Sequence, residues 1–539
     1  YGYGVCNDPA GNIYLTGQFE GTTVWDPTRS TTTKGLHDAF IAKYTPDKQL
    51  VWVSAAGGLG GDAAKGIALD KSGNVYIVGE CDVLSKAGAT MDFGNGVTIT
   101  NYGINDIFVA KYDPNGKALW ARNAGGGWND KGRAIAVDDA GNAYITGEIE
   151  SESYFKDAKG TQFTIKKGDL PSDRSAKKEI FVAKYNTSGD IIWAKNFGND
   201  TLSDEARGIA CDRAGNCYVT GYFKGTAKFG PFSLTSRGSE DIAIWKLSTN
   251  GDVVWVKQAG GSYGDIGRAM TIDEKNNTIY LTGEFTWKAT FGPSGASKTI
   301  ESEGKTDVFC ASYSTTGNFL WVKPGGGNYN DIGRGITIDK YSNVYITGVY
   351  GGPANFGALT LAAADTFHAD VFTVSYSSNG SERWAQKAGG DSLDEGHAVS
   401  VDNMGKIYVT GYFNNKIKFG AETITAMDHN EIFLVCYSEA LASRPNGNAT
   451  AFSASANGSC GQMNLSWTPG QGIQRIIVGR AGADVNRPPV NGIEYTGNTA
   501  FGLGDALGDG NYVVYNGAGN SAALTNVGSG THYFKIYEY

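Results

Sequence analysis

The fold is decided by the stretch Gly141-Asn142-Ala143-Tyr144-Ile145-Thr146-Gly147, because near copies of it recur seven times along the chain. The copies follow one another at intervals of about 65 residues, a period typical of proteins built from repeated units. Their central tyrosines are Tyr14, Tyr76, Tyr144, Tyr218, Tyr280, Tyr345 and Tyr408. Seven such repeats predict a ring of small units rather than one large core.

Each repeat is predicted to hold four strands. The first ends in an aspartate such as Asp138, and an aspartate followed by Gly-Asn is typical of a hairpin turn. The tyrosine stretch is the second strand, residues 106–112 and their relatives are the third, and a run centred on a tryptophan such as Trp120 is the fourth. The seventh repeat has no tryptophan strand, so we expect a strand upstream of residue 1 to complete it and close the open sheet edges.

The repeated pattern resembles a known family. It reads Gly-Ile-Ala-x-Asp, then Gly-Asn-x-Tyr-x-Thr-Gly, Asp-x-Phe-x-Ala-Lys-Tyr, Gly-x-x-x-Trp and Gly-Gly, and it is similar to the bacterial SBBP-type β-propeller repeat, which is itself related to NHL repeats. The resemblance covers residues 1 to about 438 and implies a seven-bladed β-propeller over residues 1–440. It implies little about activity, because propellers serve binding, scaffolding and catalysis alike.

The period stops near residue 441, where residues 441–448 are predicted to form a linker. Residues 449–539 resemble a fibronectin type III-like sandwich that is truncated at its C-terminus. Residues 463–480 match the second and third strands of that family, and Tyr533 stands where its corner tyrosine lies. Residues 489–495 and 512–517 resemble a variant of this domain that is found in secreted multidomain proteins of the Bacteroidetes, which often continue into a sorting domain for type IX secretion. The expected fold class is therefore all-β.

Composition excludes several classes of function. The net charge of −9 argues against a nucleic-acid partner, which needs a basic surface. No apolar run of about 18 residues exists, so no membrane span is expected. The abrupt ends indicate a piece of a longer protein, so the lack of a targeting segment says nothing about location. Cys211 and Cys217 flank one predicted hairpin turn, where they could form a disulfide or serve as two small core residues.

The candidate binding residues lie on the loop face, the end of the ring that carries the connections from strand two to three and from strand four to the next repeat. Six aspartates on this face each precede a basic residue or a histidine by three positions. They could form a charged ring that holds calcium or an anionic ligand, or they could be loop caps and ion pairs. We favour the structural interpretation, because a catalytic site needs differentiated acids and bases. The aspartates are Asp62, Asp130, Asp204, Asp265, Asp331 and Asp394, and the partners are Lys65, Arg133, Arg207, Arg268, Arg334 and His397.

Aromatic residues beside these aspartates break the symmetry of the ring. Trp128, Tyr263 and Tyr329 stand at the loop tips, where Leu393 is the equivalent residue of another repeat. Such rings could stack on sugars, or they could cover the backbone of their own loops. No phosphate-binding loop, nucleophile elbow or zinc spacing is present, so neither a catalytic residue, a metal site nor a cofactor is predicted.

These observations predict a secreted or cell-surface recognition module without catalytic activity. Its loop face is expected to bind a glycan or a protein, as in adhesion. One alternative is a component or cargo of a type IX secretion or gliding apparatus, with secretion proteins as partners. The other is a glycan-active enzyme, which would need a differentiated pair of carboxylates about 5 to 10 Å apart on the loop face.

Overall fold

The computed structural model describes residues 1–82, 89–166, 177–199, 201–362, 368–438, 450–456, 462–468, 475–483, 485, 496–527 and 531–538. Every regular element among these residues is a β-strand. The chain divides into two compact units. The first comprises residues 1–403 and 407–436, and the second comprises residues 404–406 and 437–539. The predicted linker, residues 441–448, lies outside the described residues.

The strands of the first unit follow the sequence repeats, and each repeat forms one antiparallel sheet, numbered here as repeat sheets 1 to 7. Sheet 1 contains β1 (Gly2–Asn7), β2 (Ile13–Asp26), β3 (Arg29–Tyr44) and β4 (Leu50–Ala56). Sheet 2 contains β5 (Asp62–Leu69), β6 (Val75–Asp82), β9 (Asn105–Tyr112) and β10 (Ala118–Gly125). Sheet 3 contains β11 (Lys131–Val137), β12 (Ala143–Ile149), β15 (Glu179–Tyr185) and β16 (Ile191–Phe197).

The remaining sheets repeat this order. Sheet 4 contains β17 (Glu205–Cys211), β18 (Cys217–Phe223), β21 (Asp241–Leu247) and β22 (Val253–Gly261). Sheet 5 contains β23 (Ile266–Asp273), β24 (Thr278–Phe291), β25 (Lys298–Ser314) and β26 (Phe319–Gly327). Sheet 6 contains β27 (Ile332–Ile338), β28 (Val344–Tyr350), β31 (Asp370–Tyr376) and β32 (Glu382–Gly390). Within the described residues, sheet 7 contains β33 (Glu395–Val401), β34 (Lys406–Phe419) and β35 (Glu422–Ser438).

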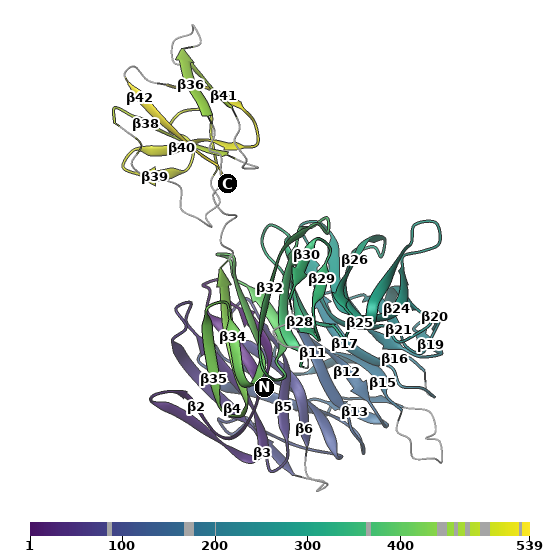
Figure 1. The fold of residues 1–539 in the computed structure, drawn as a ribbon. Coiled ribbons are helices and arrows are strands. Elements are labelled where there is room, and N and C mark those ends of the chain that lie inside the picture. The colour runs from purple at the N-terminus through teal and green to yellow at the C-terminus, as the bar shows by residue number, and fades with distance from the viewer. Residues whose placement is uncertain are drawn as a thin grey trace. The chain divides into compact units, whose positions relative to one another are not determined.

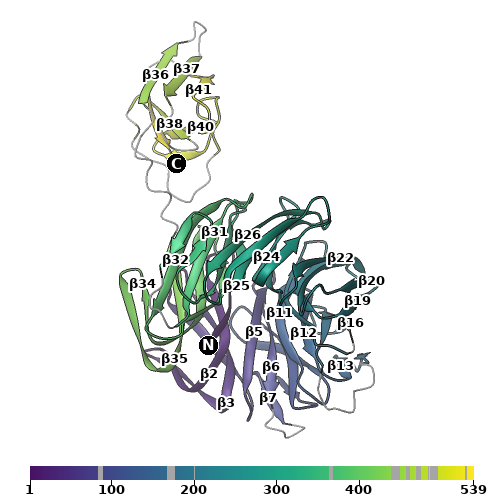
Figure 2. The same ribbon diagram turned by 45° about the vertical axis from the view of Figure 1, so that its right-hand side comes forward.

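The first strands of the seven sheets form a closed ring. Each contacts the first strand of the next sheet, from β1 through β5, β11, β17, β23 and β27 to β33, and β33 in turn contacts β1. Figures 1 and 2 show the propeller-like sheets arranged around these inner strands. The ring brings residues at equivalent positions of the repeats together at its two ends.

The recurring sequence explains both the turn within each sheet and the contact between sheets. In sheet 3, Asp138 Oδ1 accepts hydrogen bonds from the backbone N–H groups of Ala140 and Asn142, at 3.0 and 2.9 Å. Gly141 takes a φ of 79°, which favours glycine. The Tyr144 hydroxyl lies 3.0 Å from Asp138 Oδ2 and 3.0 Å from the carbonyl oxygen of Gly215 in sheet 4. The expected turn is thus confirmed, and its tyrosine also joins two neighbouring sheets.

The tryptophans of the fourth strands make a second link between sheets. The Trp120 indole donates a hydrogen bond of 3.0 Å to the carbonyl oxygen of Thr187, and the Trp193 indole donates one of 3.1 Å to that of Thr249. Apolar side chains fill the space between the sheets, as the buried cluster that joins Val78 of sheet 2 to Phe181 of sheet 3 illustrates. Both faces of tyrosine strands such as β12, β18 and β28 are therefore buried, which explains why the tyrosine stretch is apolar throughout.

The connections from strand two to strand three form hairpins that pair with the preceding sheet. Phe155 of β13 pairs with Ala124 of β10, and Asn355 of β29 pairs with Gly326 of β26. The sequence did not predict this pairing. The short hairpins are β7 (Thr90–Asp92) with β8 (Thr98–Thr100), β13 (Ser153–Lys156) with β14 (Gln162–Ile165), β19 (Thr226–Phe229) with β20 (Phe232–Thr235), and β29 (Ala354–Phe356) with β30 (Leu359–Leu361).

The second unit consists of two antiparallel sheets. Leu465 and Trp467 of one sheet and Ile477 of the other belong to one buried cluster. Tyr533 is 39% exposed. One sheet contains β36 (Thr450–Ala456), β37 (Met463–Thr468) and β41 (Ser521–Leu524), and the other contains β39 (Ala506–Gly508), β40 (Asn511–Gly517), β38 (Arg475–Ala481) and β42 (His532–Glu538).

Candidate functional site

The six predicted aspartates lie at the base of the loops that connect consecutive repeat sheets, and all six are buried. Each accepts hydrogen bonds from backbone N–H groups of these loops or of the connection between the second and third strands of its own sheet. Asp130 is typical: its Oδ2 accepts a bond of 2.6 Å from Gly126, and its Oδ1 accepts one of 2.8 Å from Glu150. Asp331 repeats the arrangement with Gly327 and Gly351, at 2.8 and 2.9 Å. The structure thus places these carboxylates as loop caps.

Burial also changes the ionisation of these carboxyl groups. The loss of hydration raises the pKa of Asp62 to about 7 and that of Asp130 to about 8. The same cause raises the pKa of Asp204 and Asp265 to about 7, of Asp331 to about 6 and of Asp394 to about 8. The described residues contain no group of three or more His, Cys, Asp or Glu side chains that could hold a metal ion.

A second carboxylate, at the start of the third strand, approaches several of these caps. A Cβ atom added at Gly125 would lie 2.6 Å from Asp106 Oδ1 and 2.9 Å from Asp130 Oδ2, so both carboxylates face this glycine. Asp307 and Asp331 flank Gly326 in the same way. All four are at most 1% exposed. These pairs are repeated and closed to solvent, whereas a catalytic pair must contact its substrate.

The basic residues that follow the aspartates do face an open space. Tyr3, Lys65, Arg133, Arg207, Arg268, Arg334 and His397, one from each repeat sheet, line a cavity of about 180 Å³ that we call the basic cavity. They occupy equivalent positions near the beginning of the first strands, so the ring of strands brings them together. Tyr3 stacks on His397 with ring centroids 5.2 Å apart, and the Lys65 ammonium lies 3.8 Å from the centre of the Tyr3 ring.

Glutamates, which the sequence analysis did not single out, pair with these cations. Arg133 contacts Glu148 at 2.6 Å, and Arg207 contacts Glu205 at 2.6 Å. The other pairs are Lys65 with Glu80, Arg268 with Glu284, and Arg334 with Glu395. These acids occupy two positions of the repeat. Glu80, Glu148 and Glu284 directly follow the glycine that ends the tyrosine stretch, whereas Glu205 and Glu395 directly follow the buried aspartate of the loop base. A glutamate at either of these two positions was the signal that could have revealed them.

The loop tips carry apolar side chains that remain partly open to solvent. Trp128, Tyr263 and Tyr329 are 36, 53 and 46% exposed. Three leucines are exposed at the equivalent loops of the other sheets, of which only Leu393 was singled out by sequence. We define the apolar rim as these six residues: Leu59, Trp128, Leu202, Tyr263, Tyr329 and Leu393.

Two of the aromatic rings also contact their own surroundings. The Tyr263 ring packs edge-on against Trp287 with centroids 5.8 Å apart. A Cβ atom added at Gly352 would lie 2.6 Å from the Tyr329 ring, so this ring covers the glycine backbone. The aromatic residues therefore combine packing against their loops with an exposed surface.

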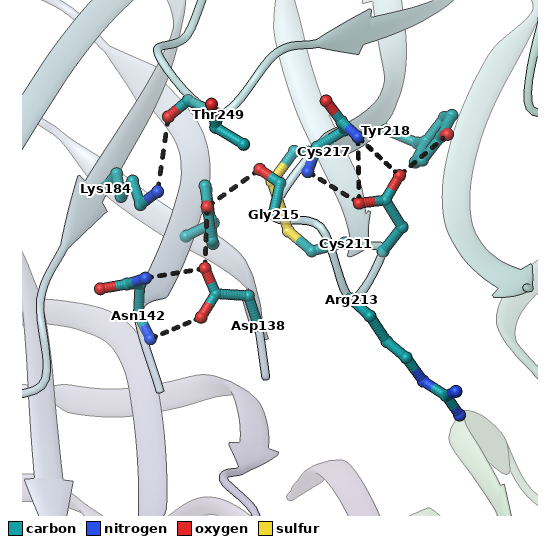
Figure 3. Close-up of a disulfide and its surroundings, with 12 residues drawn as sticks. Asp138, Asn142, Lys184, Cys211, Arg213, Gly215, Cys217, Tyr218 and Thr249 are labelled. Carbon is teal, nitrogen blue, oxygen red and sulfur yellow. Dashed lines mark hydrogen bonds between the residues drawn. A yellow bond between two sulfur atoms is a disulfide. The ribbon is translucent and has the colours of Figure 1, made fainter. Parts of the chain in front are cut away.

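The opposite end of the ring has a different chemistry. A cavity of about 390 Å³ there is lined by Asp138, Asp139, Asp212, Asp273, Glu274 and Asp339, together with Arg213, Lys275 and Lys340. Cys211, which also lines it, forms a disulfide with Cys217 across the β17–β18 hairpin. Figure 3 shows this disulfide beside Gly215 and near Asp138, the turn aspartate of the preceding sheet. The structure thus decides between the two interpretations of these cysteines in favour of the bond.

Comparison with known proteins points to the same architecture. A family model described as the SBBP beta-propeller repeat matches residues 119–154 and 254–284. Both segments run from a fourth strand through a connecting loop into the next sheet, and they include Trp128 and Tyr263 of the apolar rim. The described residues form no helix long and apolar enough to cross a membrane.

Two curated proteins are similar over parts of their length. An uncharacterized WD repeat-containing protein of Acanthamoeba polyphaga mimivirus is 22% identical over 450 residues, which are 72% of this chain and 32% of that protein. The regulatory protein FlaEY of Caulobacter vibrioides is 27% identical over 180 residues, which are 33% of this chain and 17% of that protein. The chain thus spans a third or less of each relative. The family match and the WD-repeat relative support a β-propeller repeat protein and suggest a non-catalytic scaffold for protein interactions.

Among solved structures, the Bacillus licheniformis rhamnogalacturonan lyase PL11 is 10% identical and aligns over 70% of this chain and 74% of its own length. Its TM-score is 0.24, and at that value the likeness carries no argument about fold or activity.

Proposed function

We propose that the chain is a secreted or cell-surface recognition module that binds a protein partner through its loop face, without catalysis. The observation that carries the proposal is the apolar rim, because exposed aromatic and leucine side chains at one end of a rigid scaffold are typical of a binding surface. Each of the six loops that connect consecutive repeat sheets supplies such a residue. A scaffold role also agrees with the propeller repeat that the chain carries.

We interpret the architecture as a seven-bladed propeller followed by a fibronectin type III-like sandwich. The closed contact of seven inner strands supports the blade number. The two-sheet arrangement of the second unit supports a sandwich, since this family packs two antiparallel sheets face to face. The pairing of Cys211 with Cys217 supports a location outside the cytosol, because structural disulfides persist in oxidising compartments.

A glycan is the second candidate ligand, favoured by the exposed faces of Trp128, Tyr263 and Tyr329, since aromatic rings supply flat apolar surface. The described carboxylate pairs do not favour a glycan-active enzyme, because Asp106, Asp130, Asp307 and Asp331 are buried. A role in adhesion or in a type IX secretion apparatus would use the same loop face with different partners.

The test compares two variants in one binding assay. The loop-face variant replaces Trp128, Tyr263 and Tyr329 by Ala, and the control is Tyr341→Ala. Tyr341 is 53% exposed, and it lies in the turn between β27 and β28 at the other end of the ring. Each protein is applied to a glycan array, with and without calcium, and to an array of candidate surface and secretion proteins.

We expect the wild type and Tyr341→Ala to bind the same protein and the triple variant to lose at least about tenfold in affinity, since aromatic residues often dominate an interface. Retention of intact glycans, lost only in the triple variant, would establish the second candidate instead. Shortened glycans, or equal binding by all three proteins, would contradict loop-face recognition.

A further inference from the structure

The arginines of the basic cavity leave part of their hydrogen-bonding capacity unused. Arg133 and Arg268 each bind one glutamate through Nε and Nη2. Arg207 and Arg334 contact a glutamate through Nη2 alone, and the Nε atom of each is buried without a hydrogen-bond partner. In all four arginines, the Nη1 group makes no hydrogen bond to the described part of the protein. A guanidinium carries five N–H donors, so these side chains can bind a further acceptor.

The charge around the cavity is positive even after the ion pairs are counted. The five glutamates described above form ion pairs with the five cations that line the cavity and with two further lysines. Lys131 lies 3.2 Å from Glu80, and Lys178 lies 2.6 Å from Glu205. Seven positive and five negative charges leave an excess of two. His397 adds none at neutral pH, because burial lowers its pKa.

The cations also oppose one another. Burial and the positive charges of Arg133 and Lys131 lower the pKa of Lys65 despite its pair with Glu80. Burial lowers the pKa of Arg334, and the nearby charge of Arg268 acts in the same direction. An anion inside the ring would offset this repulsion.

The size of the cavity limits the ligand. A volume of about 180 Å³ corresponds to about six waters in the liquid and is below the range of typical small-molecule pockets. It accommodates a single anionic head group. Planar guanidinium groups favour carboxylate and phosphate oxygens, which they contact with two parallel N–H bonds. The cavity lies near the same end of the first strands as the loop face.

We propose that the basic cavity is a binding site for one oxyanion group, a carboxylate or a phosphate, held by the unused donors of Arg133, Arg207, Arg268 and Arg334. The group is either a free small anion or the head group of a larger molecule on the loop face. The site is distinct from the apolar rim and goes beyond the recognition function proposed above.

Isothermal titration with two probes, inorganic phosphate and glutarate, tests the proposal. Titrations are made at neutral pH and constant ionic strength, because salt screens exposed charges. The variants are Arg207→Gln, Arg334→Gln and the conservative Arg207→Lys. The matched control is Arg213→Gln, because Arg213 has a 77% exposed side chain, pairs with Glu274 and lines the opposite cavity.

We expect saturable one-site binding of at least one probe to the wild type and to Arg213→Gln. Affinity should fall about tenfold in Arg207→Gln and Arg334→Gln, because each loses a charge-assisted hydrogen bond. Arg207→Lys keeps the charge but loses the planar donors, so it should bind several-fold more weakly than the wild type while remaining folded by circular dichroism.

The choice of probe identifies the source of the anion. Binding of glutarate supports a carboxylate such as an acidic side chain presents, and binding of phosphate alone supports a free or esterified phosphate. Saturable binding of neither probe, or equal losses in Arg213→Gln and Arg207→Gln, would overturn the proposal. The triple variant of the apolar rim should bind the probe like the wild type, so failure of loop-face recognition and failure of the anion site give different results.

Discussion

The aspartates of the loop bases and the arginines of the basic cavity recur with the same period, three residues apart, yet their environments differ. Asp130 is buried, and both of its oxygens accept backbone N–H bonds. Arg207 keeps part of its side chain accessible and leaves Nε without a hydrogen-bond partner. The comparison shows that periodicity identifies positions that recur in the fold. It does not distinguish a side chain whose hydrogen bonds are satisfied within the protein from one with unused hydrogen-bonding capacity. A substitution should therefore affect stability at the first set and ligand binding at the second.

The largest effect is expected from Asp130→Ala. This substitution leaves the buried N–H groups of Gly126 and Glu150 without their acceptors, and each unsatisfied buried group costs about 1 to 3 kcal/mol. The free energy of unfolding should fall by about 3 kcal/mol, measured by urea denaturation. Asp130→Asn retains one acceptor oxygen and should lose less.

The control is Asp252→Ala, which removes an exposed carboxylate. If Asp130→Ala lowered the free energy of unfolding no more than this control, the role of Asp130 as a loop cap would be contradicted. Asp252 is a suitable control, because its side chain is 75% exposed and pairs with Lys195 at the surface. Surface pairs of this kind contribute about 1 kcal/mol or less.

The strand order of the repeats could be predicted from sequence because its signals are local. The turn at Asp138, the buried tyrosine strand and the tryptophan strand each depend on residues within one repeat. The pairing of Phe155 with Ala124 could not, since it joins a connection of one repeat to the outer strand of another. Pairing between repeats depends on how the sheets meet in space.

The candidate site was predicted in position but not in chemistry. The period located Asp130 and Arg133, and the structure separates them into a backbone cap and a wall of the basic cavity. The glutamates were missed because they are divided between two positions of the repeat, so no single position carries an acid in every sheet: Glu148 follows the tyrosine stretch, and Glu205 follows a cap aspartate. Leu59 and Leu202 were missed, although Leu393 was singled out in the equivalent loop of another repeat.

The second expected effect is a pH dependence of stability that distinguishes the buried aspartates of the loop bases from the glutamates of the basic cavity. The pKa of Asp130 is about 8 in the folded chain, against about 3.9 in an unfolded one, so the native state retains a proton that the unfolded state releases. The free energy of unfolding should therefore fall as pH rises from about 4 through 8. One such proton contributes a slope of up to about 1.4 kcal/mol per pH unit. Urea denaturation at several pH values should show a shallower slope for Asp130→Asn.

The glutamates of the basic cavity should act in the opposite direction. Burial opposes ionisation of Glu205, but Arg207 and Lys178 lower its pKa to about 2. Its stabilising contribution is present above the unfolded pKa of about 4.3 and is lost as pH falls toward 2. If the free energy of unfolding depended on pH in the same way for the wild type, Asp130→Asn and Glu205→Gln between pH 3 and 8, the proposed difference between the aspartates and the glutamates would be wrong.

The smallest effect is expected from Arg207→Gln in the absence of added phosphate or glutarate. Glu205 keeps its contact with Lys178 at 2.6 Å, so the variant leaves no unpaired buried carboxylate. The substitution also removes the Nε group that lacks a partner in the wild type, which offsets part of the lost pairing with Glu205. The free energy of unfolding should change by less than about 1 kcal/mol, measured by urea denaturation beside Asp130→Ala. A loss of stability as large as that of Asp130→Ala would show that Arg207 stabilises the fold as the aspartate does. The proposed distinction between stabilising aspartates and ligand-binding arginines would then be wrong.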